Sequence, residues 1–173
     1  MALSGPLEIR DERPEDAADI RQVTYAAFQA AEQGGQAEAD IITALRAAGA
    51  LSVSLVAVAD GRIVGHVAFS PVTIDGAPRG WHGLGPVSVV PDMQKRGVGG
   101  ALIRTGLERL RQVSARGCVV LGEPGYYGRF GFGTDPRLVL EGVPAGYFMR
   151  LTLEGETPSG VVEYHSAFAA ALS

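Results

Sequence analysis

Short apolar runs alternate along the chain with stretches of helical periodicity, a pattern typical of a mixed α/β domain. Residues 7–10 alternate apolar and polar side chains, as a half-buried strand does. Two helices are predicted after it, the first beginning at Pro14 and the second ending at Gly49. The apolar positions expected to face the core from these helices are Ile20, Val23, Ala27, Phe28, Ile41, Ile42, Leu45 and Ala48.

Two strongly apolar runs, 51–59 and 63–74, follow the helices and are predicted to be strands. The dipeptide Asp60-Gly61 separates them, and Asp-Gly between two such runs favours a tight hairpin turn. Asp75 and Gly76 are expected to end the second strand. The hairpin therefore supplies two neighbouring strands of a sheet.

A third central strand is predicted to begin near Gly83, Gly85 and Pro86 and to continue through 87–90. Glycine and proline at that place indicate a bulge or a gap in strand pairing. An amphipathic helix of about four turns should follow the strand. Its apolar stripe is formed by Val98, Leu102, Ile103, Leu107, Leu110 and Val113.

Gly117 is expected to end this helix, and residues 118–122 are predicted to be a brief buried strand. A strand, a helix and a second strand of these lengths make a right-handed crossover. The strands at 87–90 and 118–122 should therefore be parallel. Farther along, the runs 148–153 and 160–164 have the character of strands, and we expect one domain that spans residues 1–173.

The segment from Gln94 to Gly100 joins the third strand to its helix and reads Gln-Lys-Arg-Gly-Val-Gly-Gly. The first backbone N–H groups of a helix have no partners inside it, and the macrodipole places about half a positive charge there. Glycines at 97, 99 and 100 let the backbone approach a ligand without interference from a Cβ atom. The segment therefore predicts a site for a ligand that carries phosphate.

The overall charge narrows the classes of partner. A net charge of −4 argues against nucleic acid or an acidic membrane surface, because both need a basic face. The one lysine among 15 basic residues is Lys95, inside the glycine segment. With one cysteine, no recognisable signal peptide and no apolar run of membrane length, a cytoplasmic protein is expected. The three scattered histidines and Cys118 predict no metal site.

Two common phosphate-binding motifs do not match the glycine segment. The P-loop requires Lys-Ser or Lys-Thr after its glycines, and neither pair follows here. The dinucleotide-binding fingerprint requires Gly-x-Gly-x-x-Gly after an early strand, whereas Gly97-Val98-Gly99-Gly100 lies in mid-chain after a hairpin. The motif that does match is Gln-x-x-Gly-x-Gly, present as Gln94 to Gly99 after a Val-Pro-Asp turn.

About 30 residues later the chain reads Tyr-Tyr-Gly-Arg-Phe-Gly-Phe, at positions 126–132. Together with Gln94 to Gly99 and the order of predicted elements, this segment resembles the GCN5-related N-acetyltransferases (GNAT), in particular a bacterial branch of predicted acetyltransferases. The resemblance covers roughly residues 7–135. It implies a mixed, mostly antiparallel sheet whose central parallel strand pair is splayed at a bulge, with helices on both faces.

The resemblance also implies acetyl-CoA as the donor. Its pyrophosphate would rest on the amides of Gln94, Lys95, Arg96, Gly97, Val98, Gly99 and Gly100, with Lys95 and Arg96 supplying positive charge. Its pantetheine arm would pair with the edge of Val87, Ser88 and Val89 like an added strand. The N–H of Val89 or Val90 would polarise the thioester carbonyl.

By its place in the motif, Tyr127 is the candidate proton donor to the CoA sulfur, because a phenol stays protonated at neutral pH. Glu123 is the first candidate for the general base, and His82 is an alternative. His66 and Cys118 lie in apolar strands and are interpreted as core residues, so direct attack by the amine is expected rather than a covalent cysteine intermediate.

The leading hypothesis is therefore an enzyme that acetylates an amine, in a small molecule or a peptide. A non-catalytic module that binds or senses acyl-CoA is the alternative, and a longer acyl donor also stays open. Glu32 and Glu38 are interpreted as solvated helix charges rather than as contacts for a cationic amine. The acidic chain favours a cationic acceptor, and a homodimer paired through C-terminal strands is compatible with this fold.

Overall fold

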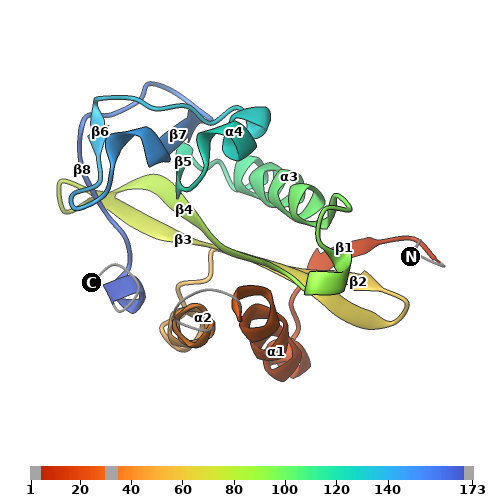
Figure 1. Cartoon of the computed structure of the whole chain (residues 1–173). Coiled ribbons are helices and arrows are strands. Elements are labelled where there is room, and N and C mark those ends of the chain that lie inside the picture. The colour runs from red at the N-terminus through yellow and green to blue at the C-terminus, as the bar shows by residue number, and fades with distance from the viewer. Residues whose placement is uncertain (1–4, 30–34, 170–173) are drawn as a thin grey trace.

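A twisted mixed sheet forms the centre of the fold, and helices cover both of its faces (Figure 1). The computed structural model describes residues 5–29 and 35–169. The strands are β1 (Glu8–Asp11), β2 (Val53–Ala59), β3 (Arg62–Ile74), β4 (Ala77–Val89), β5 (Gly117–Leu121), β6 (Leu138–Val139), β7 (Phe148–Thr152) and β8 (Gly160–Glu163). The α-helices are α1 (Ala17–Phe28), α2 (Gln36–Ala47), α3 (Val98–Gln112) and α4 (Pro124–Tyr127). Short 3-10 turns occupy Pro14–Asp16, Pro91–Met93, Gly128–Phe130, Ala145–Tyr147 and Ser166–Phe168.

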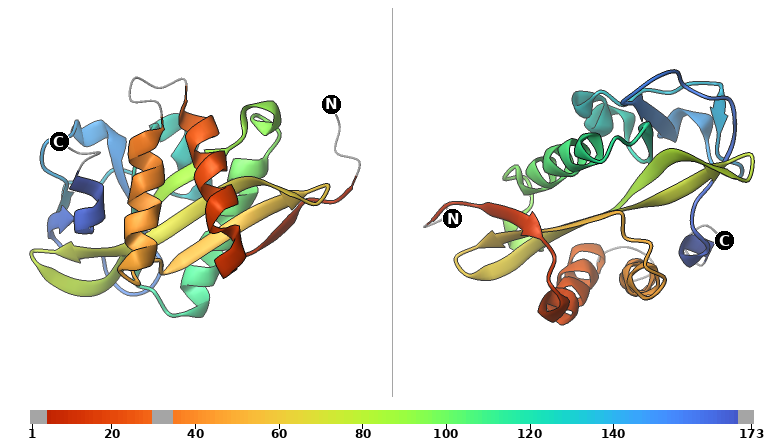
Figure 2. Two further views of the ribbon diagram at one scale, coloured as in Figure 1. Left: turned by 90° about the horizontal axis from the view of Figure 1, so that it is seen from below. Right: turned by 180° about the vertical axis from the view of Figure 1, so that it is seen from behind.

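The main path of the sheet runs β1-β2-β3-β4-β5-β7. Every neighbouring pair on this path is antiparallel except β4 and β5, which are parallel. Strand β8 pairs with the end of β3 and with β6. Helices α1 and α2 lie side by side across one face, and α3 lies on the other (Figure 2). The predicted sheet with a central parallel pair and helices on both faces is therefore confirmed.

The core is built on both faces of the central strands, which explains why β2 and β3 are apolar almost without interruption. On one face Leu55 and Phe69 pack with Leu102 of α3 in the largest buried cluster. On the other face Val56 packs with buried side chains of α1 and α2, namely Ile20 and Ile42. Burial on both faces removes the alternation that marks a half-exposed strand.

The third central strand begins earlier than predicted. Asp75 and Gly76 end β3 as predicted, but they do so by forming a second tight turn, in which both have positive φ angles, 51° and 78°. Strand β4 begins at Ala77 directly after this turn and continues to Val89. The Asp-Gly dipeptide therefore forms the same kind of tight hairpin turn here as at Asp60-Gly61, where the φ angles are 51° and 77°.

Two positions predicted to face the core are exposed instead. Ala48 is the C-cap of α2 and is exposed. Val113 follows the last residue of α3, and 68% of its surface is accessible. Both lie where a helix ends, so the helical period no longer fixes the direction of the side chain. Helix α3 otherwise buries its predicted stripe, including Leu102, Ile103 and Leu110.

A buried polar cluster joins β1, β2 and β3 on the face covered by α1 and α2. The His66 side chain is fully buried, and its Nε2 lies 2.7 Å from the Ser54 hydroxyl. The Ser54 hydroxyl in turn donates to Glu12, whose carboxylate also accepts from Arg46 Nε at 2.8 Å. Burial lowers the pKa of His66, against the opposite effect of the nearby Glu12. The interpretation of His66 as a hydrogen-bonded core residue is confirmed.

The lowered pKa of His66 makes folding sensitive to acid. Below the ordinary histidine pKa of about 6.5 the unfolded chain takes up a proton that the native chain does not. The free energy of unfolding should therefore fall as the pH drops from 7 to 5, by up to about 1.4 kcal/mol per pH unit. Chemical denaturation at several pH values measures this slope. His66→Gln should lower stability at pH 7 but flatten the slope more than His82→Gln does, and an unchanged slope in His66→Gln would contradict the assignment.

Candidate active site

Strands β4 and β5 separate after a short parallel pairing. The pairing spans 81–83 of β4 and ends where Gly83 lies opposite Val119. The predicted parallel pair is thus confirmed, and it splays before 87–90, as the glycines and proline of β4 predicted. The reason is a bulge in β4. From Leu84 to Val87, β4 advances by three residues while its partner β3 advances by two, and Gly85 adopts a φ of 136°, which favours glycine.

The backbone of β4 beyond the bulge has an open edge. The Val90 N–H donates to the Val64 carbonyl at 2.9 Å, so this amide is occupied and only Val89 remains of the two predicted donors. Because backbone groups alternate along an antiparallel pair, the amides of Val87 and Val89 point away from β3. In the described part of the chain no strand pairs with them on that side. An extended ligand can therefore pair with this edge.

The glycine segment crosses from β4 to α3 in a fixed conformation. The Gln94 side chain ties it to the strand, because its Nε2 donates to the Val89 carbonyl at 2.9 Å. Lys95 and Gly97 have positive φ angles of 63° and 85°, and Gly97 is the N-cap of the 15-residue helix α3. The first amides of α3 consequently face the space beside the open edge of β4, with the positive end of the helix dipole behind them.

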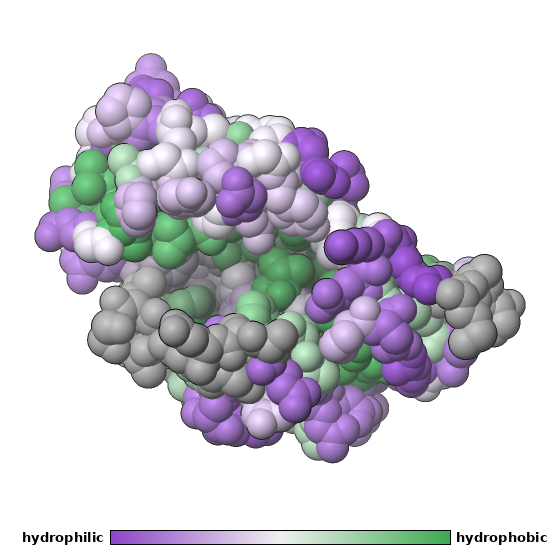
Figure 3. All heavy atoms as spheres, in the orientation of Figure 1, coloured by the Kyte–Doolittle hydropathy of each residue, from purple (hydrophilic) through white to green (hydrophobic). Residues whose placement is uncertain are grey.

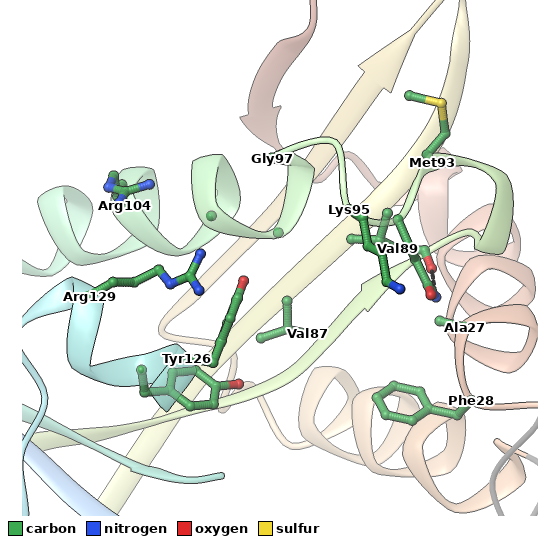
Figure 4. Close-up of a pocket in the computed structure, with 14 residues that line it drawn as sticks. Ala27, Phe28, Val87, Val89, Met93, Lys95, Gly97, Arg104, Tyr126 and Arg129 are labelled. Atoms are coloured by element: carbon green, nitrogen blue, oxygen red, sulfur yellow. Dashed lines mark hydrogen bonds between the residues drawn. The ribbon is translucent and has the colours of Figure 1, made fainter. Parts of the chain in front are cut away.

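A cavity of about 670 Å³ occupies this space (Figure 4). It is lined by Ala27, Phe28, Val87, Val89, Met93, Gln94, Lys95, Gly97, Gly99, Gly100, Arg104, Tyr126, Tyr127 and Arg129. Eight of the residues predicted from sequence are among them: Val87, Val89, Gln94, Lys95, Gly97, Gly99, Gly100 and Tyr127. We call this space the donor cavity. Its lining brings together one end of α1, the edge of β4, the start of α3 and the aromatic segment that contains α4.

Four predicted site residues do not line the donor cavity. Ser88 is 1% exposed and points to the opposite face of the sheet, where its hydroxyl lies 3.4 Å from that of Thr24. Val98 is 1% exposed and belongs to the core. Arg96 is exposed in the loop, and Glu123 is exposed at the N-cap of α4. The side chains of these four residues therefore stay outside the cavity, although Ser88, Arg96 and Val98 each lie in the chain between two residues that line it.

Sequence reasoning missed two arginines that line the donor cavity, Arg104 and Arg129. The Arg104 guanidinium lies 4.8 Å from the centre of the Phe130 ring, and that of Arg129 lies 4.7 Å from the centre of the Tyr126 ring. Such stacking orients a cation while leaving its N–H groups available. Arg104 follows Gly100 by four residues, so the helical period of α3 was a signal that could have found it. With Lys95, these arginines give the cavity three cations, and no acidic residue is among the described residues that line it.

Tyr126 and Tyr127, the two tyrosines of α4, contact different parts of the chain. Their rings pack edge to face, with centroids 5.0 Å apart. A Cβ on Gly99 would come within 3.1 Å of the Tyr126 hydroxyl, which points toward the start of α3 (Figure 4). The Tyr127 ring instead rests on Gly122, where a Cβ would approach Cε2 to 2.4 Å. Burial raises the pKa of Tyr127 to about 12, so it is a neutral phenol at physiological pH.

A second cavity of about 350 Å³ adjoins the donor cavity, and we call it the acceptor cavity. It is lined by Phe28, Glu38, Ile41, Leu84, Gly85, Pro86, Val87, Leu121, Tyr127, Tyr164 and Phe168. The two cavities share Phe28, Val87 and Tyr127. Figure 3 shows the apolar surface in the hollow between the two sides of the molecule. A ligand in one cavity can therefore meet a ligand in the other beside the Tyr127 ring.

The remaining candidate residues lie elsewhere. His82 is half-buried, its Nδ1 lies 3.0 Å from the Ser52 hydroxyl, and burial lowers its pKa. Cys118 is fully buried, and burial raises the pKa of its thiol, as expected for an inert core residue. Glu32 lies outside the described residues. Within 5–29 and 35–169 no group of three or more metal-binding side chains occurs, and no helix is long and apolar enough to cross a membrane.

Comparison with known proteins agrees with this geometry. Residues 8–134 match the family model of the acetyltransferase (GNAT) domain. The uncharacterized N-acetyltransferase YhbS of Escherichia coli is 36% identical over 169 residues, which cover 92% of this chain and 97% of YhbS. A second uncharacterized N-acetyltransferase of Escherichia coli, YjhQ, is 40% identical over 136 residues, which cover 76% of this chain and 71% of YjhQ.

Solved structures extend the comparison. A GNAT family acetyltransferase from Brucella melitensis, in complex with acetyl-CoA, is 53% identical with a TM-score of 0.84, and the match covers 94% of this chain and 98% of that one. The structure of YhbS in complex with CoA has a TM-score of 0.86 at 32% identity, over 98% of this chain and 94% of YhbS. The splayed parallel strands, the glycine segment at the start of α3 and these matches lead to one conclusion: the chain belongs to the GNAT acetyltransferase family.

Proposed function

We propose that this protein transfers the acetyl group of acetyl-CoA to an amine by direct attack. The observation that carries the proposal is the meeting of two cavities at Phe28, Val87 and Tyr127. One cavity suits a long anionic donor, since it combines three cations, a helix N-terminus and an open strand edge. The other suits a second, smaller molecule. A site that only bound or sensed acyl-CoA would need the donor cavity alone.

The proposed binding of acetyl-CoA is supported by a relative that binds it and by the cations that line the donor cavity. Acetyl-CoA is bound by the Brucella relative, which is 53% identical to this chain. In our proposal the pyrophosphate lies on the amides of Gln94 to Gly100, and Lys95, Arg104 and Arg129 neutralise the phosphates. The pantetheine arm pairs with the backbone edge of Val87 to Val89. Ser88 and Val98 then contribute backbone groups only, because their side chains are buried elsewhere.

The reaction requires three changes at the reacting atoms. The amine loses a proton and its nitrogen forms a bond to the thioester carbon, whose oxygen takes the negative charge of a tetrahedral intermediate. The N–H of Val89 stabilises that oxygen. The C–S bond then breaks, the sulfur leaves as a thiolate that ends as the CoA thiol, and the nitrogen loses its second proton. The products are the amide, CoA and one proton released to the solvent for each ammonium consumed.

Tyr127 acts in this scheme by donating a hydrogen bond to the leaving sulfur. Its pKa of about 12 lies well above that of an ordinary thiol, about 8.5. A thiolate does not take a proton completely from so weak an acid. A hydrogen bond that strengthens as charge develops on the sulfur is therefore the role that this pKa supports. The final proton can reach the thiolate from solvent once the products separate.

The proton acceptor of the amine stays a prediction. Glu123 can act only through water, because it is exposed and lines neither cavity. His82 also lines neither cavity; it is half-buried and hydrogen-bonded to Ser52, and its lowered pKa keeps it neutral, and therefore able to accept a proton, near pH 7. Separate kcat-pH profiles of Glu123→Gln and His82→Gln would distinguish the two, since loss of the base should lower kcat and remove the acidic limb of the profile.

The proposal is tested by following CoA thiol release from acetyl-CoA in the presence of a panel of amines. Release that depends on the amine, with the acetylated product detected by mass spectrometry, is the expected result. Tight acetyl-CoA binding by calorimetry with no product from any amine would instead favour the non-catalytic alternative. Propionyl-CoA and butyryl-CoA in the same assay test whether a longer acyl donor is used.

Arg129→Gln should weaken the binding of acetyl-CoA by about tenfold, because it removes one of three cations from the donor cavity. The loss should shrink when the salt concentration is raised from 50 to 500 mM, since Arg129 is exposed and its charge is screened. Titration calorimetry measures both effects. Arg111→Gln, at the exposed far end of α3, is the matched control and should bind normally. Equal affinities of Arg129→Gln and the native protein would remove Arg129 from the site.

A further inference from the structure

The acceptor cavity is almost entirely apolar. Helices α1 and α2, strand β4, the end of β5 and the C-terminal turn all contribute hydrophobic walls, formed by Phe28, Ile41, Leu84, Pro86, Val87, Leu121 and Phe168. Two phenols complete the lining. Burial raises the pKa of both Tyr127 and Tyr164, so both hydroxyls are neutral at physiological pH. Among the described lining residues, Glu38 is the only one that carries a charge.

Glu38 has one carboxylate oxygen that the described residues leave unpaired. Its Oε2 is inaccessible to solvent and has no hydrogen-bond partner among the described residues. A buried carboxylate oxygen without a partner is costly, and such groups in native proteins are normally paired. Two other buried polar atoms share this condition, His66 Nδ1 and Ser70 Oγ, but neither residue lines the donor or the acceptor cavity. The interpretation of Glu38 as a solvated helix charge therefore does not hold for its Oε2, although the residue as a whole is half-buried.

The charges of the two cavities are opposite. The donor cavity has three cations and the acceptor cavity has one anion, and Phe28, Val87 and Tyr127 lie between them. An ammonium group would supply the cation that the described residues do not offer to Glu38. The cavity walls contain no counter-ion for a second charge on the same molecule, because no other ionised side chain of the described residues lines them. A polyamine or a free amino acid would thus bury a charge without a partner, whereas an apolar body would be well accommodated.

We propose that the acceptor is a small monoamine carried on an apolar or aromatic body, and that Glu38 selects it by pairing with its ammonium group. This inference rests on the proposed function, and names the substrate class of that site. A volume of about 350 Å³ is at the lower end of the range for ligand pockets, which fits a small molecule. Glu38 acts here as a specificity residue. It holds the charged amine at the cavity wall, and the proton is lost when the amine moves toward the thioester.

The test compares 2-phenylethylamine and hexylamine with spermidine, lysine and a short peptide that has a free N-terminus, using CoA release by the native protein. The two apolar monoamines should have the highest kcat/KM, by at least tenfold. In Glu38→Gln their KM should rise about 30-fold or more, because the ammonium loses its counter-ion in an apolar site, while kcat changes little. Spermidine or the peptide as the best substrate would overturn the inference and leave the proposed function standing. A fall in kcat at constant KM in Glu38→Gln would overturn the recognition role.

Asp40→Asn is the matched control, because it removes an equal charge from the same helix at an exposed position paired with Arg21. Its KM for both monoamines should equal that of the native protein. Thermal melting and acetyl-CoA binding of Glu38→Gln verify that this variant is folded with an intact donor cavity. Should no amine be acetylated, calorimetry with 2-phenylethylamine on the CoA-loaded protein still decides the matter. Binding that Glu38→Gln abolishes supports the inference although the proposed function fails, and absence of binding overturns both.

Discussion

Replacement of Tyr127 by Phe is expected to lower kcat by about 100- to 1000-fold and to leave the affinity for acetyl-CoA within about twofold of the native value. The variant keeps the Tyr127 ring, which packs on Gly122 and lines both cavities, but removes the hydroxyl that we propose donates to the leaving sulfur. Binding depends on the cations and the strand edge, which do not change. Steady-state kinetics with the best amine, together with titration calorimetry, separates the two quantities.

The pH dependence provides an independent check on the role of Tyr127. Because its pKa is about 12, the phenol does not titrate between pH 6 and 10, and the native protein and Tyr127→Phe should have pH profiles of the same shape. Tyr126→Phe is the matched control, since the Tyr126 hydroxyl points to Gly99 at the start of α3. Its kcat should fall by less than about tenfold. Equal turnover of Tyr127→Phe and native protein would remove Tyr127 from the mechanism.

Gly106→Ala should cause the largest loss of stability of any single methyl addition in α3. Gly106 is buried against β3, and a Cβ at this position would lie 2.2 Å from Cε1 of the Phe69 ring. Helix and sheet must separate, or the fully buried ring must leave its place in the core. Overpacking of this kind costs about 2–3 kcal/mol, more than the roughly 1 kcal/mol that alanine contributes to helix propensity. A melting temperature several degrees lower is the expected result.

Two further variants identify the cause of that loss. Gly100→Ala, on the same helix, brings its Cβ no closer than 3.1 Å to the flexible end of Arg104, so the ligand-free protein should be as stable as the native one or slightly more stable. Phe69→Leu in the Gly106→Ala background should restore part of the lost stability, because the smaller side chain leaves room for the methyl group. If Gly106→Ala melted at the native temperature, the close contact with Phe69 would be wrong.

Much of the fold could be predicted from local patterns. Helix α3, β5 and the β2–β3 hairpin follow from a helical stripe, a short buried run and an Asp-Gly turn. The same kind of turn at Asp75-Gly76 was interpreted as the end of a strand, so the start of β4 was placed too late. Ala48 and Val113 were placed in the core because periodicity alone does not indicate where a helix ends.

The donor cavity could be predicted better than the acceptor cavity, for a physical reason. Nine of the fourteen residues that line the donor cavity come from the continuous stretch 87–104, in which a strand leads through Gln94 to Gly100 into one helix, so spacing along the chain gives spacing in the molecule. The acceptor cavity is assembled from segments far apart in sequence, such as Glu38 on α2, Leu84 on β4 and Phe168 near the C-terminus. Whether the Glu38 carboxylate meets water or a buried wall depends on tertiary packing, which no local pattern contains.

The position of the C-terminal turn also bears on how acceptor choice can diverge among related chains. Tyr164 and Phe168 line the acceptor cavity but lie beyond residues 8–134, which match the family model. The other nine residues that line this cavity, Glu38 among them, lie within the match, so only one part of the cavity wall comes from outside it. Changes confined to this last stretch of the chain would alter that part of the wall without touching any residue that lines the donor cavity. Exchange of residues 157–173 between relatives should accordingly change which apolar bodies are accepted and leave the proposed pairing of the amine with Glu38 in place, and a purification tag is better placed at the N-terminus, away from Phe168.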